Sequence, residues 1–205
     1  MKRVYVIAHT ESLHQIQGLG GGWFDTSLTT RGKEQAKTIA ERLYAALGVT
    51  GIPIYCSDLK RASEVAIILE EVFQGQVFSD HRLREMCFGE AEGKDKNWQL
   101  ANFTPPTGNN RMDHRVYKHA ETRRELASRI TDFMNNVETR MGETSIIVTH
   151  GFALTFVILS WLRIPIEHMD YANFRSHPGG VTLLVEDDIF RNREVSYVNN
   201  IDFMK

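Results

Sequence analysis

The sequence predicts an α/β protein, a three-layer α/β/α sandwich built on a mainly parallel central sheet. Three short apolar runs, at 4–7, 52–56 and 145–149, are rich in β-branched residues and typical of strands buried on both faces. Segments with helical spacing of apolar residues separate these runs. Strands that alternate with helices favour a parallel sheet with helices on both sides.

The first strand, 4–7, leads into a glycine-rich loop at 18–22 and then into a helix that Thr29 or Thr30 can cap. Gly48 ends this helix, because glycine readily adopts the left-handed conformation of a helix C-cap. The second strand, 52–56, precedes a helix for which Ser57 or Asp58 is the expected N-cap. The remaining predicted elements are a long helix over 126–141, a strand at 145–149, a helix at 152–162, and late strands at 181–186 and 194–198.

A chain of 205 residues fits one domain, so we assign residues 1–205 to a single domain. The segment 93–120 breaks the alternation, since it holds Pro105-Pro106 and Asn109-Asn110 and has little periodicity. We therefore predict that 93–120 is an insertion, a cap over the active site, rather than a domain of its own.

The composition excludes several classes of protein. With 42% hydrophobic and 24% charged residues, the chain is neither disordered nor collagen-like nor a coiled coil. A net charge of -2 provides no basic excess for a nucleic-acid partner. The longest apolar run, 152–162, is about half a membrane span, and the N-terminal apolar run is too short for a signal sequence. Two cysteines cannot staple the domain, so we expect a soluble cytoplasmic protein with no membrane partner, and a homodimer stays open.

Two histidines directly follow predicted strands: His9 after the first and His150 after the third. Ligands of open α/β sheets bind outside the carboxyl ends of the strands, where Arg61 in the helix after the second strand would also lie. A lone histidine after a strand is more often structural, but two imidazoles and a guanidinium together suit a phosphate-sized dianion. The eight histidines show no metal-binding spacing, so we expect neither a metal nor another cofactor.

Five blocks in order resemble the histidine phosphatase family, also called phosphoglycerate mutase-like proteins, and more closely its phosphatase branch. The blocks span most of the chain, and their order makes coincidence implausible. They are Ala8-His9-Thr10-Glu11, Gly22-Trp23-Phe24-Asp25-Thr26-Ser27-Leu28-Thr29, Ser57-Asp58-Leu59-Lys60-Arg61-Ala62, the stretch from Leu83-Arg84-Glu85 to Phe88-Gly89-Glu90-Ala91-Glu92-Gly93, and Val148-Thr149-His150-Gly151.

The resemblance implies a phosphoglycerate mutase-like fold and hydrolysis of a small phosphorylated metabolite through a phosphohistidine, without a metal. It makes His9 the nucleophile, places Arg61 and His150 on the phosphoryl oxygens, and makes Glu85 the general acid. The substrate-binding positions that it implies are Ala8, Thr10, Gln15, Gly22 and Gly151.

One position departs from the family pattern: Ala8 stands where the family almost always has arginine, so a bidentate contact with phosphate is lost. Two interpretations compete, a natural pseudoenzyme and an engineered Arg-to-Ala variant of an active enzyme. We favour the variant, with weakened activity, because decay should rarely remove one member and spare the other four.

Two further functions stay open beside the phosphatase. A mutase shares the first half-reaction, although the 93–120 segment looks shorter than its mutase equivalent. A non-catalytic sensor of a phosphorylated ligand is disfavoured, because it has no need of Glu85. The cations and aromatics of 93–120 either recognise a second anionic or planar group of the substrate or form a solvated loop. The family's Gly-Gly-Glu-Ser before the long helix is replaced by His119-Ala120-Glu121-Thr122.

Overall fold

The computed structural model describes residues 1–108 and 110–205 and shows one six-stranded mixed sheet, so the predicted α/β class is confirmed. The strand order is β3-β2-β4-β1-β5-β6. The first four strands in this order run parallel, and β5 and β6 are antiparallel to their neighbours. The strands are β1 Lys2–Ala8, β2 Pro53–Cys56, β3 Gln76–Ser79, β4 Thr144–Thr149, β5 Val181–Glu186 and β6 Arg193–Asn200.

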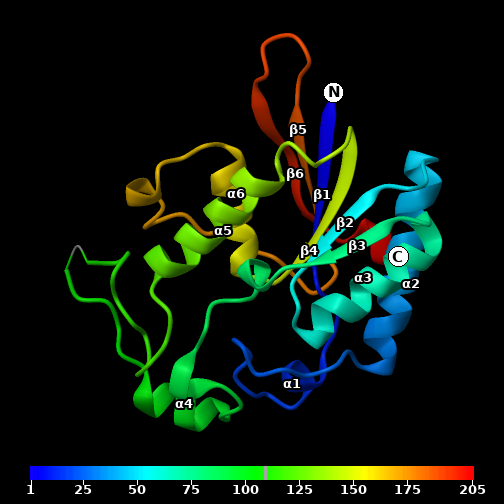
Figure 1. Ribbon diagram of the computed structural model, residues 1–205. Coiled ribbons are helices and arrows are strands. Elements are labelled where there is room, and N and C mark those ends of the chain that lie inside the picture. The colour runs from blue at the N-terminus through cyan, green and yellow to red at the C-terminus, as the bar shows by residue number, and fades with distance from the viewer. Residues whose placement is uncertain (109) are drawn as a thin grey trace.

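Helices cover both faces of the sheet (Figure 1). On one face lie α2 (Thr30–Leu47) and α3 (Lys60–Phe73), and on the other lie α5 (Arg123–Val137) and α6 (Ala153–Trp161). Alternate residues of β1 enter two separate hydrophobic clusters, one on each face. This two-sided burial explains why β1 is an uninterrupted apolar run.

The predicted caps of α2 are confirmed, whereas the cap predicted for α3 is wrong. Thr29 Oγ1 accepts a hydrogen bond from Gly32 N, and Gly48 ends α2 with φ of 62°. The N-cap of α3 is Leu59, because Ser57 and Asp58 have other partners. Ser57 Oγ lies 2.8 Å from His150 Nε2, and Asp58 forms an ion pair with the guanidinium of Arg84.

Three short elements lack a sequence signal: β3, the single turn α1 (Leu13–Ile16) and α4 (Lys96–Asn102). The predicted insertion 93–120 contains α4, and its residue 109 lies outside the described residues. The start of this segment is held to the glycine-rich loop, since Gly20 N donates to Lys94 O and Gly93 N to Gly20 O. No helix in the described ranges is long and apolar enough to cross a membrane.

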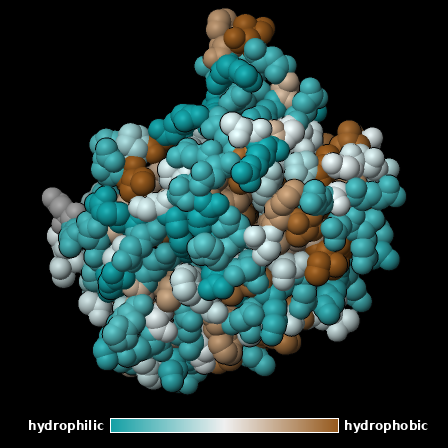
Figure 2. All heavy atoms as spheres, in the orientation of Figure 1, coloured by the Kyte–Doolittle hydropathy of each residue, from teal (hydrophilic) through white to brown (hydrophobic). Residues whose placement is uncertain are grey.

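The face shown in Figure 2 is mostly hydrophilic, with a hydrophobic patch at the tip of the projecting β5–β6 turn. Ile189 and Phe190 of this turn are 82% and 77% exposed. The turn lies near the N-terminus, at the end of the sheet opposite to the carboxyl end of β1 (Figure 1).

Candidate active site

His9 and His150 directly follow two neighbouring parallel strands, β1 and β4, and lie at the carboxyl ends of these strands. In the register of β1 and β4, Ala8 pairs with Thr149, so the next residue of each strand leaves the sheet at the same level. Both imidazoles are buried, and their ring centroids lie 5.2 Å apart. The prediction that the two histidines meet at the carboxyl ends of the strands is confirmed.

Arg61 reaches this edge from the first turn of α3, and its guanidinium is buried. Its Nε donates to His9 Nε2 at 3.2 Å, while the two terminal nitrogens donate to the carbonyls of Gly22 and Phe24. A side chain at position 22 would meet Phe88 N at 2.8 Å, and φ there is +54°, so glycine is required. The glycine-rich loop thus orients Arg61 toward His9.

The contacts of His9 define its tautomer. Its Nδ1 lies 2.8 Å from the carbonyl of Thr10, which can only accept, so Nδ1 carries the proton. Its Nε2 then carries a lone pair, which accepts a hydrogen bond from Arg61 Nε. Burial, and next the charge of Arg61, lower the pKa of His9 to about 3. A neutral imidazole with an available nitrogen lone pair is the form that acts as a nucleophile.

His150 has a buried nitrogen without a partner. Its Nε2 lies 2.8 Å from Ser57 Oγ, and that hydroxyl accepts from Leu59 N, so its own hydrogen is free to point at Nε2. When the Ser57 hydroxyl donates to Nε2, the proton of the neutral ring is on Nδ1, which has no hydrogen-bond partner among the described residues. Burial, followed by Arg61 and His9, lowers the pKa of His150 well below the usual value. An unpaired buried N–H is a donor prepared for an acceptor such as a phosphate oxygen.

The carboxylate of Glu85 is held at the start of α6, immediately after His150. Its Oε2 accepts from Phe152 N and its Oε1 from Ala153 N, both at 3.0 Å. Met86 N donates to Oε1 as well, at 2.9 Å. These hydrogen bonds hold the carboxylate next to Gly151, since Oε2 lies 4.0 Å from the position of a Cβ on that residue.

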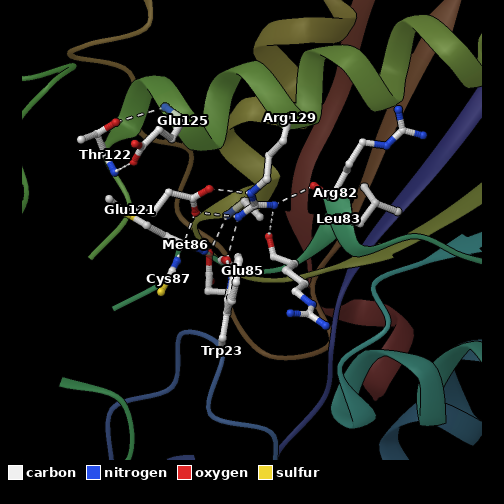
Figure 3. Close-up of polar contacts among 12 residues, drawn as sticks. Trp23, Arg82, Leu83, Glu85, Met86, Cys87, Glu121, Thr122, Glu125 and Arg129 are labelled. Carbon is white, nitrogen blue, oxygen red and sulfur yellow. Dashed lines mark hydrogen bonds and ion pairs between the residues drawn. The ribbon is translucent and has the colours of Figure 1, made fainter. Parts of the chain in front are cut away.

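Arg129 of α5 fixes the backbone that carries Glu85, as Figure 3 shows. Its guanidinium donates to the carbonyls of Arg82, Arg84 and Glu85 at 2.7–2.8 Å. It also forms an ion pair with Glu121, and Trp23 Nε1 donates to the same carbonyl of Glu85. The turn before Glu85 is therefore tied to a helix of the sandwich.

The segment His119-Ala120-Glu121-Thr122, which replaces the family's Gly-Gly-Glu-Ser, stabilises the structure around Glu85. Thr122 caps α5 in a reciprocal capping box with Glu125 (Figure 3). Glu121 pairs with Arg129 and accepts from Cys87 N. The segment supports the Glu85 turn from behind.

The other predicted binding residues have different positions. Thr10 is buried and donates through Oγ1 to the carbonyl of Gly32, and Ala8 is 2% exposed at the end of β1. The side chain of Gln15 is exposed, and its Oε1 accepts from the backbone and hydroxyl of Ser12, which caps α1, so its role in substrate binding stays a prediction. The structure uses Gln15 for capping, because α1 turns that residue outward.

The buried residue of α1 is His14, which sequence reasoning missed. Its ring centroid lies 6.1 Å from that of His9. Burial, and next Arg61, lower its pKa to about 4. The signal in the sequence is a histidine that lies between His9 and the glycine-rich loop at 18–22. A turn of four residues has no periodicity that would show which of its sides faces inward.

A cavity of about 210 Å³ adjoins the site beneath the 93–120 segment. Arg111, His114, Arg123 and Phe152 line it, and Phe152 N is a donor to Glu85. A larger cavity of about 490 Å³ lies beside the β3 edge, and none of the predicted site residues line it. In the described ranges, no group of three or more His, Cys, Asp or Glu residues could hold a metal ion.

Comparisons of the sequence with known proteins show its family. The profile of the histidine phosphatase superfamily (branch 1) matches residues 4–197. A putative phosphoserine phosphatase 2 of Hydrogenobacter thermophilus is 31% identical over 182 residues, 84% of this chain and 87% of that protein. A probable phosphoglycerate mutase of Citrobacter koseri is 30% identical, over 80% of this chain and 77% of that protein.

Solved structures share the fold. A mycobacterial glucosyl-3-phosphoglycerate phosphatase in complex with VO3 has a TM-score of 0.80 at 21% identity, over 97% of this chain and 99% of the other. A putative α-ribazole-5'-P phosphatase of Escherichia coli has a TM-score of 0.77 at 24% identity, over 98% and 97% of the two chains. Because the superfamily profile covers most of the sequence and the Hydrogenobacter relative exceeds 30% identity over most of both proteins, this chain belongs to the histidine phosphatase superfamily, branch 1.

Proposed function

We propose that the protein is a phosphomonoesterase that hydrolyses a small phosphorylated metabolite through a phosphohistidine on His9. The observation that carries this proposal is the state of His9: a buried neutral imidazole, fixed through Nδ1, with its Nε2 lone pair beside the Arg61 guanidinium. Phosphatases among the relatives support the same reaction class.

In the first half-reaction, the Nε2 lone pair of His9 attacks phosphorus and the P–O bond to the leaving group breaks. Arg61 and the unpaired Nδ1–H of His150 donate to the nonbridging oxygens, where charge must be stabilised. The carboxylic acid of Glu85 gives its proton to the departing alkoxide, which leaves as an alcohol.

In the second half-reaction, water attacks the phosphohistidine. The Glu85 carboxylate takes one proton of the water as the new P–O bond forms. The P–N bond breaks, its electron pair returns to Nε2, and inorganic phosphate leaves. Both protonation states of Glu85 are used once per turnover, and no metal or redox partner takes part.

The cavity under the 93–120 segment supports a substrate with a second anionic group, with this segment as its cap. Arg111 and Arg123 donate to backbone carbonyls of residues 169–172 rather than to carboxylates. Burial, and next the charge of Arg111, lower the pKa of Arg123. An anion in the cavity would relieve this repulsion, so phosphomonoesters that also bear a carboxylate or second phosphate are the favoured class.

A mutase is the second candidate, since probable phosphoglycerate mutases are among the relatives. Its first half-reaction would be identical, but the phosphoryl group would pass to a second hydroxyl instead of water. Release of inorganic phosphate, compared with isomerisation of a phosphorylated hydroxy acid, separates the two activities.

The test is phosphate release from monoesters with and without a second anionic group, in buffer containing EDTA. We expect turnover of the substrates with a second anion and a loss of about 10³-fold or more in the His9→Ala variant. Acid-labile phosphate should be trapped on the unsubstituted protein and be missing from that variant. The exposed His168 provides the matched control, and His168→Ala should retain full activity. Equal rates for His9→Ala and the unsubstituted protein would exclude the covalent mechanism.

A further inference from the structure

Position 8 leaves a gap in the charge of the site. The methyl group of Ala8 is buried and offers no donor to an anion. The guanidinium of Arg61 contacts His9 through Nε, and its two terminal nitrogens donate hydrogen bonds to backbone carbonyls. A phosphoryl group on His9 would need another donor on its remaining side.

The ring of His14 is buried beside that of His9. It is 7% exposed, whereas Leu13, Gln15 and Ile16, the other residues of α1, are all exposed. Its ring lies 6.1 Å from that of His9, between centroids. Burial, and next the positive charge of Arg61, lower the pKa of His14, so its ring is neutral beside that guanidinium.

The ring of His14 is fixed through one nitrogen only. Its Nδ1 lies 2.9 Å from Thr26 Oγ1 and 3.1 Å from Ser12 Oγ. Its Nε2 has no hydrogen-bond partner in the part of the chain that the structure describes. That nitrogen lies against Gly21, where an added Cβ would come within 2.8 Å of it. Glycine at 21 thus leaves room for the ring in an orientation that its hydrogen bonds select.

We propose that His14 is a further phosphate-binding residue of this site, whose Nε2–H donates to the transferring phosphoryl group and supplies the contact that Ala8 cannot make. This inference rests on the proposed function and extends it to a residue outside the predicted set. It also gives Ala8 another interpretation, in which the site is complete with a histidine on α1 in place of an arginine on β1.

Two substitutions separate phosphate binding from a structural role. His14→Asn keeps a polar group at the position of Nδ1, in reach of Thr26 and Ser12, and removes Nε2. His14→Gln places an amide near the position of Nε2. If His14 has a structural role, the contacts of Nδ1 are needed and asparagine should preserve its function better. If His14 binds phosphate, the donor at Nε2 is needed and glutamine should preserve its function better. His168→Ala again serves as the control.

The measurement is the Kd of inorganic phosphate by titration calorimetry, together with kcat and KM on one monoester and the midpoint of thermal unfolding. We expect His14→Asn to weaken phosphate binding about 10- to 100-fold, as for a lost hydrogen bond to a charged group, with an unchanged unfolding midpoint. His14→Gln should recover at least half of that loss on a logarithmic scale.

Three results would overturn the inference in distinguishable ways. Unchanged phosphate affinity in both variants, with an active unsubstituted protein, would remove His14 from the site and leave the proposed function intact. Equal losses in both variants with a lower unfolding midpoint would make His14 a structural residue of α1. An unsubstituted protein that binds no phosphate and releases none would reject the proposed function together with this inference.

Discussion

At the scale of single residues, the charge of the site depends on its occupant. With no anion present, burial keeps His9, His14 and His150 neutral, and Arg61 is the permanent cation among these four. A phosphate dianion stabilises the charged forms of nearby imidazoles, which raises their pKa values. Binding should therefore be coupled to proton uptake, most plainly at a histidine that does not serve as the nucleophile.

The Ala8→Arg substitution tests how complete the site is without a guanidinium on β1. If His14 already supplies the missing donor, kcat should rise by less than about tenfold, because the added contact duplicates an existing one. If the protein is instead a weakened variant, restoring an oxyanion donor should raise kcat by about 10²–10³. Steady-state kinetics of both proteins on one shared monoester decide between these outcomes. The same substitution made in His14→Asn should give the larger gain.

At the scale of elements, the Glu85 turn depends on a helix on the same side of the sheet as α6. Arg129 of α5 donates to three carbonyls of the turn and pairs with Glu121, and both side chains are at most 14% exposed. A fork of donors with this reach is specific to arginine, since the lysine ammonium is a single point of charge. The helix therefore holds the general acid of the proposed reaction through its backbone.

The Arg129→Lys substitution should loosen this turn while keeping the charge. We expect a fall in stability of about 1–3 kcal/mol, because carbonyls lose their donors. We also expect a fall in kcat of about tenfold or more with a smaller change in KM, since general acid catalysis depends on position. Urea unfolding and steady-state kinetics provide the measurements. Arg124→Lys is the control on the same helix, because Arg124 forms an exposed ion pair with Asp113. Equal kcat values for the two variants would contradict a positioning role for Arg129.

The sequence predicts those elements whose pattern is local and repeated. Five of the six strands and the long helices have apolar runs or periodicity, and Gly48 marks a helix end that the structure confirms. The edge strand β3 is only four residues long and mostly exposed, so it carries no burial pattern. Ser57 is a good N-cap by residue type, but its hydroxyl is used by His150, a partner 93 positions away in the sequence. Such competition between local and distant partners cannot be seen in a single segment.

The same distinction applies to the candidate site. His9 and His150 are predictable because each follows a strand, and adjacent strands bring them together. His14 is not predictable in this way, since its inward direction depends on Thr26, Gly21 and a four-residue turn. Arg129 also escapes prediction, because its role depends on backbone carbonyls that no residue type reveals.

At the scale of the whole molecule, the candidate site should lower the stability of the folded protein in acid. Its three neutral imidazoles are buried at the edge where β1 and β4 end, in the middle of the sheet order. In the unfolded chain each would protonate near pH 6.5, whereas in the folded protein the pKa values are about 3 for His9, about 4 for His14 and well below the usual value for His150. Below pH 6.5, the unfolded state thus binds more protons than the native state does.

The free energy of unfolding should therefore be highest above about pH 6.5 and fall as the pH decreases toward 4. Each histidine contributes a slope of at most about 1.4 kcal/mol per pH unit, so the three together approach about 4 kcal/mol per unit near pH 5. Urea unfolding at several pH values between 7.5 and 5 measures this slope, in a range where most carboxylates remain ionised in both states. In a His150→Gln variant, the slope should decrease by at most about 1.4 kcal/mol per pH unit, the contribution of one histidine, whatever the absolute stability of the variant. Inorganic phosphate should reduce the slope as well, because an anion favours protonated imidazoles in the folded protein. A stability that does not change between pH 6.5 and 5 would show that these histidines are charged, or open to water, in the folded state.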